Sequence, residues 1–166
     1  SCRWLADTLL IGDNYYKEVK KINRGISSPH FFLSVVSGKS GVGKSRIIKE
    51  ASTKGVVCNN KIINIDSEKK SFSCKMFMEI ICSQITQLPF FNENVDFLSD
   101  RQDDTISFAS RILYKHNIDY NCEWEKCSDF LITALQEDKY VLLLDNLQHF
   151  DKISLQIVER TISYLS

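Results

Sequence analysis

The sequence predicts an α/β fold in which a parallel sheet is covered by helices on both faces, giving a three-layer core. A glycine-rich turn at 38–45 follows the mainly apolar run 32–37 and precedes a stretch with helical periodicity. A second apolar run, 140–144, ends in Asp145, and its lack of polar alternation is typical of a strand buried on both faces. Both patterns favour parallel strands that are joined by crossover helices.

The glycine-rich turn has the complete phosphate-binding pattern G-x-x-x-x-G-K-S. Such a turn points backbone N–H groups at the phosphates, and the next helix directs the positive end of its dipole at the anion. We expect Lys44 to reach the β- and γ-phosphates of a nucleoside triphosphate, and the Ser45 hydroxyl to coordinate its Mg²⁺. The alternative, a plain surface loop, leaves the flanking strand and helix patterns unexplained. The residues expected to contact the nucleotide here are Gly38, Lys39, Ser40, Gly41, Val42, Gly43, Lys44, Ser45 and Arg46.

The carboxylate of Asp145 ends the second apolar run, as in a Walker B strand. The carboxyl ends of parallel strands form the edge at which α/β sheets bind ligands. We therefore expect Asp145 to hold the Mg²⁺, together with Ser45. An apolar run that ends in aspartate is common, so this prediction depends on the phosphate loop being present as well.

These motifs resemble the AAA-like ATPase modules of STAND proteins, which occur in bacterial signalling and antiviral proteins, in large transcriptional regulators and beside soluble adenylyl cyclase domains. The resemblance rests on the segments 10–13, 38–46 and 142–151. It implies a P-loop NTPase fold of the additional-strand type, with ATP and Mg²⁺ as cofactors. It also implies that Ile11 and Gly12 lie near the adenine, although a tight turn is an equal alternative, because Asp13 replaces the family's usual arginine.

Position 146 departs from the pattern that the resemblance implies, because ATPases of the AAA+ type usually carry glutamate there to orient the attacking water. Asn146 cannot accept a proton, so slow hydrolysis is expected unless the base comes from elsewhere. Asp151 is the nearest downstream carboxylate and is a catalytic candidate beside Lys44 and Asp145. His149 is a weaker candidate. The reading that we favour is that Asp151 caps the next helix and that His149 is an ordinary polar residue.

The motifs and the resemblance imply an ATPase of low turnover that acts as a nucleotide-driven switch in a multidomain signalling or defence protein. The expected partners are ATP, the lid, effector and sensor domains of a longer chain, and further copies in a nucleotide-dependent homo-oligomer. A kinase-like phosphoryl-transferring enzyme is an alternative, opposed by the distant Walker B strand and the lack of a lid with paired arginines. An ATP-binding scaffold without turnover is another, and Asn146 favours it.

Composition restricts the function classes. Lysine plus arginine equals aspartate plus glutamate, at 21 each, so no broad electrostatic surface for nucleic acid or an anionic membrane is expected. The basic side chains at 17–24 are expected to form a solvated helix face. A membrane-spanning helix needs about 20 apolar residues, and every apolar stretch of this sequence is much shorter. A cytoplasmic protein is therefore expected. The six cysteines form no C-x-x-C pair and are expected to be reduced and structural.

The rest of the chain supplies the expected scaffold. Met76 and Met78 are expected to fill the core. In the strand order 5-1-4-3-2 only the first three strands are found, so we expect 1–166 to be the N-terminal part of one P-loop domain, lacking later strands and the lid. A compact three-stranded variant is the alternative.

The expected parts of the chain are a leading segment and helix at 1–30, a core at 31–166 and a helical insertion near 89–137. Strands are expected at 31–37, 61–66 and 140–145. Helices are expected at 13–24, 74–88, 104–116, 124–137 and from Asp151 onward.

Overall fold

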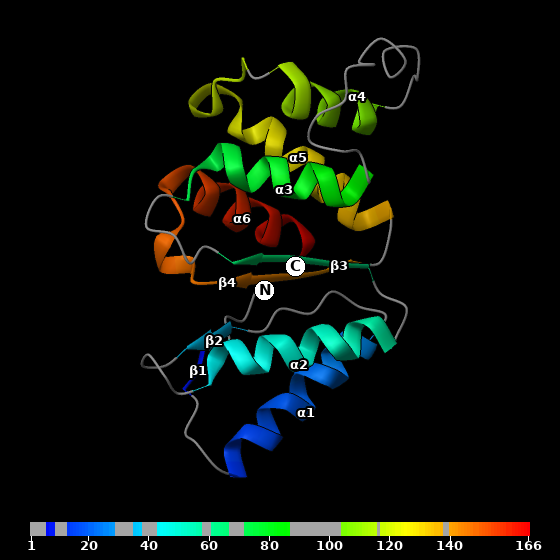
Figure 1. The fold of residues 1–166 in the computed structure, drawn as a ribbon, viewed down its shortest axis with the longest axis vertical. Helices are drawn as coiled ribbons and strands as arrows, with labels where there is room; N and C mark the ends of the chain where they lie inside the picture. Colours follow the sequence, from blue (N-terminus) through cyan, green and yellow to red (C-terminus); the bar gives the residue numbers. More distant parts are fainter. Residues whose placement is uncertain are drawn as a thin grey trace. The chain divides into compact units, whose positions relative to one another are not determined.

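The computed structural model is a mixed α/β structure that divides into two compact units (Figure 1). The first unit comprises 1–64, 139–145 and Ser166, and the second comprises 65–138 and 146–165. The residues that the structure describes are 6–8, 13–28, 35–37, 43–57, 61–66, 72–86, 104–115, 117–137 and 140–166.

A small parallel sheet opens the first unit. Strand β1 (Ala6–Thr8) pairs with β2 (Val35–Ser37), with Ala6 opposite Val35 and Thr8 opposite Ser37. Strand β2 lies within the predicted range 31–37. The sequence did not predict β1, because three residues are too short to show a period of two.

Two helices and strand β4 (Tyr140–Asp145) form the core of the first unit. Helix α1 (Asp13–Ser27) buries Ile22 and Ile26, and helix α2 (Lys44–Val57) buries Ile47 in the same cluster. The predicted end of α1 near Arg24 is wrong, because burying Ile26 outweighs the turn signal of Gly25. Three partly buried side chains complete this cluster, which we call the first core: Val19, Val141 and Leu143.

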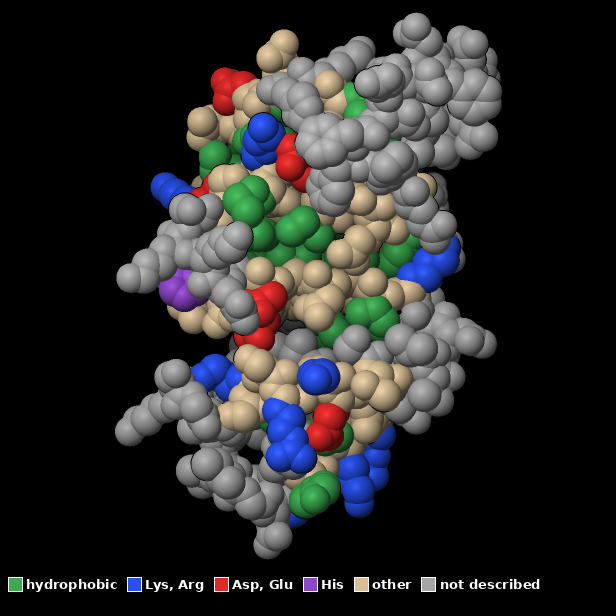
Figure 2. Space-filling view, in the orientation of Figure 1, with side chains coloured by type: hydrophobic (Ala, Val, Ile, Leu, Met, Phe, Trp, Pro, Cys, Tyr) green, Lys and Arg blue, Asp and Glu red, His purple; other side chains and the backbone are tan. Residues whose placement is uncertain are grey.

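The basic face of α1 is exposed, as expected for a solvated helix face. Figure 2 shows lysine and arginine side chains on the described surface of this unit, together with acidic ones. The exposed basic residues of α1 are Lys17, Lys20, Lys21 and Arg24.

Strand β3 (Lys61–Asp66) pairs with β4, and both strands have the predicted bounds. The Lys61 Nζ atom lies 5.6 Å from the centroid of the Tyr140 ring, so the two strands begin side by side. Asp66 and Asn146 are hydrogen-bonded where the strands end, so the strands run in the same direction. The expectation that β4 is buried on both faces is wrong. Its residues are half-buried, since β3 is its one neighbour among the described strands.

Helices build the second unit. Those that Figure 1 draws there are α3 (Cys74–Thr86), α4 (Asp104–Ser110), the π-helical turn η2 (Arg111–Lys115), α5 (Tyr120–Glu137) and α6 (Lys152–Leu165). Helix α5 packs on α6, and α3 contacts both. Fully buried side chains from these elements include Phe77, Met78, Ile81, Cys82, Ile112, Leu113, Cys127, Leu131 and Ile157.

Three expectations in this unit need correction. Met76 is 38% exposed, whereas Met78 is buried as predicted. The helix predicted at 104–116 changes to a π-helical turn at Arg111. Helix α5 begins at Tyr120 rather than near 124, because Asp119 caps it. The Asp119 Oδ1 atom accepts the N–H of Asn121 at 3.1 Å, an N-cap signal that the sequence analysis overlooked.

The described cysteines have free thiols. Cys74, Cys82 and Cys127 are buried, and Cys122 is exposed. Burial raises the pKa of Cys74 to about 12 and that of Cys127 to about 12, so both are protonated at neutral pH. They therefore pack as small apolar side chains. Among the described helices none is long and apolar enough to cross a membrane.

Candidate nucleotide-binding site

The backbone at the start of α2 explains one of the glycines of the phosphate-binding pattern. Gly43 has φ of 95°, in the region that glycine adopts and other residues avoid. A Cβ atom at this position would meet nothing within 4 Å, so conformation rather than space requires glycine. The Gly43 carbonyl accepts the N–H of Ile47 at 3.2 Å, which makes Gly43 the N-terminal cap of α2.

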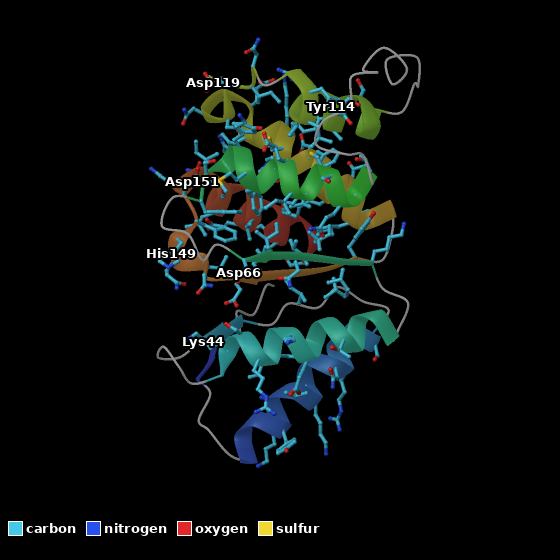
Figure 3. The ribbon with its side chains drawn as sticks, in the orientation of Figure 1. Lys44, Asp66, Tyr114, Asp119, His149 and Asp151 are labelled. Atoms are coloured by element: carbon cyan, nitrogen blue, oxygen red, sulfur yellow. The ribbon has the colours of Figure 1, made fainter. Side chains whose placement is uncertain are left out.

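Lys44, Ser45 and Arg46 form the first turn of α2 (Lys44 is labelled in Figure 3). Backbone N–H groups of a first turn have no acceptor within their helix and form the positive end of its dipole, which suits an anion. Lys44 is half-buried and Ser45 is exposed. The Arg46 Nε atom lies 3.5 Å from Glu50 Oε1 in an exposed pair, which holds this side chain weakly.

The other predicted nucleotide contacts lie outside the described residues, and they remain predictions. They are Ile11, Gly12, Gly38, Lys39, Ser40, Gly41 and Val42.

Asp145 is the last residue of β4, and the first core connects this strand to α2. Ile47 lies two residues after Ser45, and Leu143 lies two residues before Asp145. The two predicted motifs, almost a hundred residues apart in the sequence, therefore belong to one packed unit. Their oxygen donors, a hydroxyl and a carboxylate, are of the type that Mg²⁺ takes alongside phosphate and water.

Metal-binding clusters of another kind are absent from the part of the chain that the structure describes. No group of three or more His, Cys, Asp and Glu side chains there is arranged to hold a metal ion. Ser45 and Asp145 remain the predicted ligands of a nucleotide-bound Mg²⁺.

Asn146 has an unusual backbone and both ends of its amide are bonded. Its φ of 57° and ψ of 43° lie in the left-handed region, the one non-glycine case among the described residues. The Asn146 Nδ2 group donates to Asp66 Oδ1 at 2.6 Å. The Asn146 Oδ1 atom accepts a longer bond of 3.3 Å from Gln148 Nε2. Asparagine tolerates this conformation better than most residues, and the bonds hold its side chain in one orientation.

Asp66 is the residue that the sequence analysis missed. It ends the apolar strand β3 as Asp145 ends β4, and the same pattern could have identified it. Figure 3 labels Asp66, His149 and Asp151, which lie toward the same end of the second unit. The hydrogen bond between Asp66 and Asn146 joins residues that are 80 positions apart in the sequence.

Asp151 caps two helices, which confirms the capping role that we favoured from the sequence. Its Oδ1 atom accepts the N–H of Ser154 in the first turn of α6 at 2.8 Å. Its Oδ2 atom accepts the N–H of Cys74 at the start of α3 at 2.7 Å. The Phe72 and Phe150 rings contact each other at a tilt, with centroids 5.0 Å apart, and the two residues form a parallel bridge. Both oxygens of Asp151 thus stabilise helix starts.

Replacing Asp151 with alanine is expected to lower the free energy of unfolding by about 1–3 kcal/mol, because two backbone N–H groups lose their acceptor. Asp151→Asn keeps one acceptor and is expected to lose less. Urea denaturation followed by circular dichroism measures both. If Asp151→Asn abolished ATP hydrolysis without changing stability, Asp151 would instead be the catalytic base.

Comparison with known proteins assigns no family to these residues, since no family model, curated protein or solved structure matches the chain.

Proposed function

We propose that this chain is an ATP-binding switch module with slow hydrolysis, of the STAND type of P-loop ATPase. The observation that carries the proposal is the first core, in which Ile47 of α2 packs with Val141 and Leu143 of β4. A phosphate loop needs a Mg²⁺ carboxylate in the same fold unit, and this packing ties the helix after the loop to the strand that ends in Asp145.

In the proposed site, the loop 38–45 and the first turn of α2 bind the phosphates. The Lys44 ammonium neutralises the β- and γ-phosphates, and its position within the first turn adds the helix dipole to its own charge. Ser45 and Asp145 hold the Mg²⁺ that accompanies the nucleotide and that offsets phosphate charge. Arg46 is expected to bind the phosphates more weakly, because Glu50 competes for its guanidinium in an exposed ion pair.

Slow hydrolysis follows from Asn146. Its amide is bonded to Asp66 and Gln148, and an amide does not remove a proton from water. A nucleotide that persists in its site suits a switch, because the bound state lasts long enough to change domain arrangement and assembly. The pairing of β3 with β4 also agrees with the strand order of the additional-strand P-loop fold, in which the second and third strands are neighbours. We place such a module in a cytoplasmic signalling or defence protein.

The test is a set of paired measurements on the full chain with Mg²⁺ present. Titration calorimetry is expected to show binding of ATP and of a non-hydrolysable analogue, and phosphate release from ATP is expected to be slow without any acceptor substrate. Light scattering is expected to show a larger assembly with the analogue than without nucleotide. Phosphate transfer that requires an acceptor would favour the kinase-like function, and binding without turnover or assembly would favour the scaffold. Absence of ATP binding would refute the proposal.

A further inference from the structure

We propose that the exposed face of helix α1 binds the phosphate backbone of single-stranded nucleic acid. The face carries four exposed cationic side chains, Lys17, Lys20, Lys21 and Arg24, which we call the basic row. Their spacing of i, i+3, i+4 and i+7 places them in one line along the helix, about 10 Å long. The basic row shares no residue with the proposed ATP site, so binding of nucleic acid does not depend on binding of ATP.

Packing fixes the basic row on the surface of the first unit. Ile22 and Ile26 are buried in the first core, and Val19 is partly buried against them. At 3.6 residues per turn, these three positions lie on the side of the helix opposite the basic row. The row cannot turn inward without exposing this apolar side to water.

The spacing within the basic row acts against the stability of the helix. Lys17 and Lys21, and likewise Lys20 and Arg24, are like-charged neighbours at i,i+4, where equal charges repel and opposite charges attract. Two other helices of the chain use the same spacing for attraction. Their ion pairs are Arg46–Glu50 in α2 and Lys75–Glu79 in α3. A polyanion bound along the row would offset the repulsion, whereas solvent alone leaves it in place.

The basic row is a local concentration of charge in a neutral chain. Lysine plus arginine equals aspartate plus glutamate, at 21 each, so composition does not account for four cations on one face. Glu18 is the one acid between Lys17 and Arg24, which leaves this segment with four cations less one acid. A neutral chain lacks a broad positive surface, but a narrow row attracts a polyanion locally.

The surroundings of the basic row favour nucleic acid over other polyanions. An amphipathic helix binds an anionic membrane by inserting its apolar face, and that face of α1 is packed in the first core. An acidic peptide on an exposed helix face gains only surface ion pairs, each of which contributes little. A strand of B-DNA carries one phosphate per about 3.4 Å, so a row of about 10 Å faces about three phosphates, and release of their counterions drives binding.

Tyr16 favours a single strand over a duplex. It is 70% exposed and lies one turn before Lys20, at the edge of the basic row. An aromatic ring beside a row of cations is a platform on which an unpaired base stacks, whereas the bases of a duplex are already stacked on each other. The expected ligand is a single strand that is bound through its phosphates and one base, with little sequence preference.

Fluorescence anisotropy of a labelled oligothymidylate, titrated with the full chain at about 50 mM salt, tests the proposal. Replacing Lys17, Lys20 and Arg24 together with glutamine is expected to lower the affinity by about tenfold or more, because most of the phosphate contacts are lost. Tyr16→Ala is expected to lower it by about fivefold or more, and Tyr16→Phe, which keeps the ring, by less than about twofold.

The matched control for the triple variant replaces Lys49, Lys75 and Lys152 with glutamine. These exposed lysines lie on three other helices, so the net charge changes equally while the basic row is intact. The control is expected to stay within about twofold of the wild-type affinity. Equal losses in the triple variant and its control overturn the inference, because they show a general effect of charge.

Lys44→Ala separates the basic row from the proposed ATP site. This variant is expected to bind the oligonucleotide as tightly as the wild type does. A loss of binding in Lys44→Ala with no loss in the triple variant means that the oligonucleotide occupies the phosphate loop, which overturns the inference but leaves the proposed ATP-binding function standing. Failure of the wild type to bind ATP leaves the inference standing if the oligonucleotide still binds.

Three further results overturn the inference. The first is a folded wild type that does not bind the oligonucleotide, which makes the basic row a solvated helix face. The second is tighter binding of a duplex of the same length. The third is binding of polyglutamate or of phosphatidylserine vesicles in place of the oligonucleotide, which assigns the row to an acidic protein or to a membrane.

Thermal melts verify that each variant is folded. If the triple variant fails to fold, the single substitutions Lys17→Gln and Lys20→Gln decide. The logarithm of the wild-type association constant is expected to fall with the logarithm of salt concentration with a slope of about −2 to −3, and each single substitution is expected to make that slope shallower by about 0.7. Unchanged slopes in both single variants overturn the inference.

Discussion

Replacing Lys44 with alanine is expected to weaken ATP binding by about tenfold or more. The change removes the cation at the start of α2 that faces the β- and γ-phosphates, and a charge-assisted contact of this kind contributes about 1.5–3 kcal/mol. Lys44 is half-buried, so solvent screens its charge less than that of an exposed lysine. Calorimetric titration of the full chain with Mg-ATP measures the effect directly.

Lys49→Ala is the matched control for Lys44→Ala. Lys49 belongs to the same helix and is exposed, one turn further from the helix start, so its loss should leave the affinity within about twofold. Equal affinities of wild type and Lys44→Ala would mean that the loop 38–45 does not bind the nucleotide. Equal losses in both lysine variants would indicate a general effect of charge.

Asp145→Asn is expected to abolish ATP hydrolysis while leaving much of the metal-independent binding intact. Asparagine keeps the size of aspartate but lacks the charge that holds Mg²⁺. Without this ion, the negative charge that develops on the β-phosphate of the leaving ADP is not neutralised. The informative readout is phosphate release at saturating ATP and ordinary Mg²⁺. Binding of ATP without Mg²⁺ should be nearly unchanged in the same variant.

Glu159→Gln, which removes one negative charge from an exposed position on α6, serves as the control for Asp145→Asn and should retain turnover. Normal phosphate release by Asp145→Asn would show that β4 is not a Walker B strand. Loss of turnover together with a lower melting temperature would point to damage to the first core instead, because Leu143 lies two residues away. A melt recorded on each variant separates these outcomes.

Local sequence patterns were sufficient to predict most of the helices and strands. The strands predicted at 61–66 and 140–145 have the same bounds as β3 and β4, because short clusters of apolar residues between polar ones are typical of strands. The predicted start of the first helix at Asp13 agrees with the first residue of α1. The ends that were wrong, at Arg24 and near Trp124, are places where core packing or an unrecognised cap decided the boundary.

The candidate site shows the same division. The glycine turn at Gly43 and the start of a helix at Lys44 could be predicted from the sequence. Both depend on neighbouring residues in the chain. The packing of Ile47 against Val141 could not, because a contact between residues so far apart depends on how whole elements pack. Burial of β4 was overestimated for that reason, since the run of apolar residues does not reveal how many neighbours a strand has.

The sequence by itself determined the phosphate-binding pattern, the strand that ends in Asp145 and the absence of glutamate at position 146, all of which are properties of consecutive residues. Only the tertiary structure decided what Asn146 does in place of glutamate and why both oxygens of Asp151 are bonded. The partners, Asp66 and Cys74, lie 80 and 77 positions away. Periodicity and turn chemistry act over a few residues, whereas a hydrogen bond between distant side chains exists only after the strands and helices that carry them have packed.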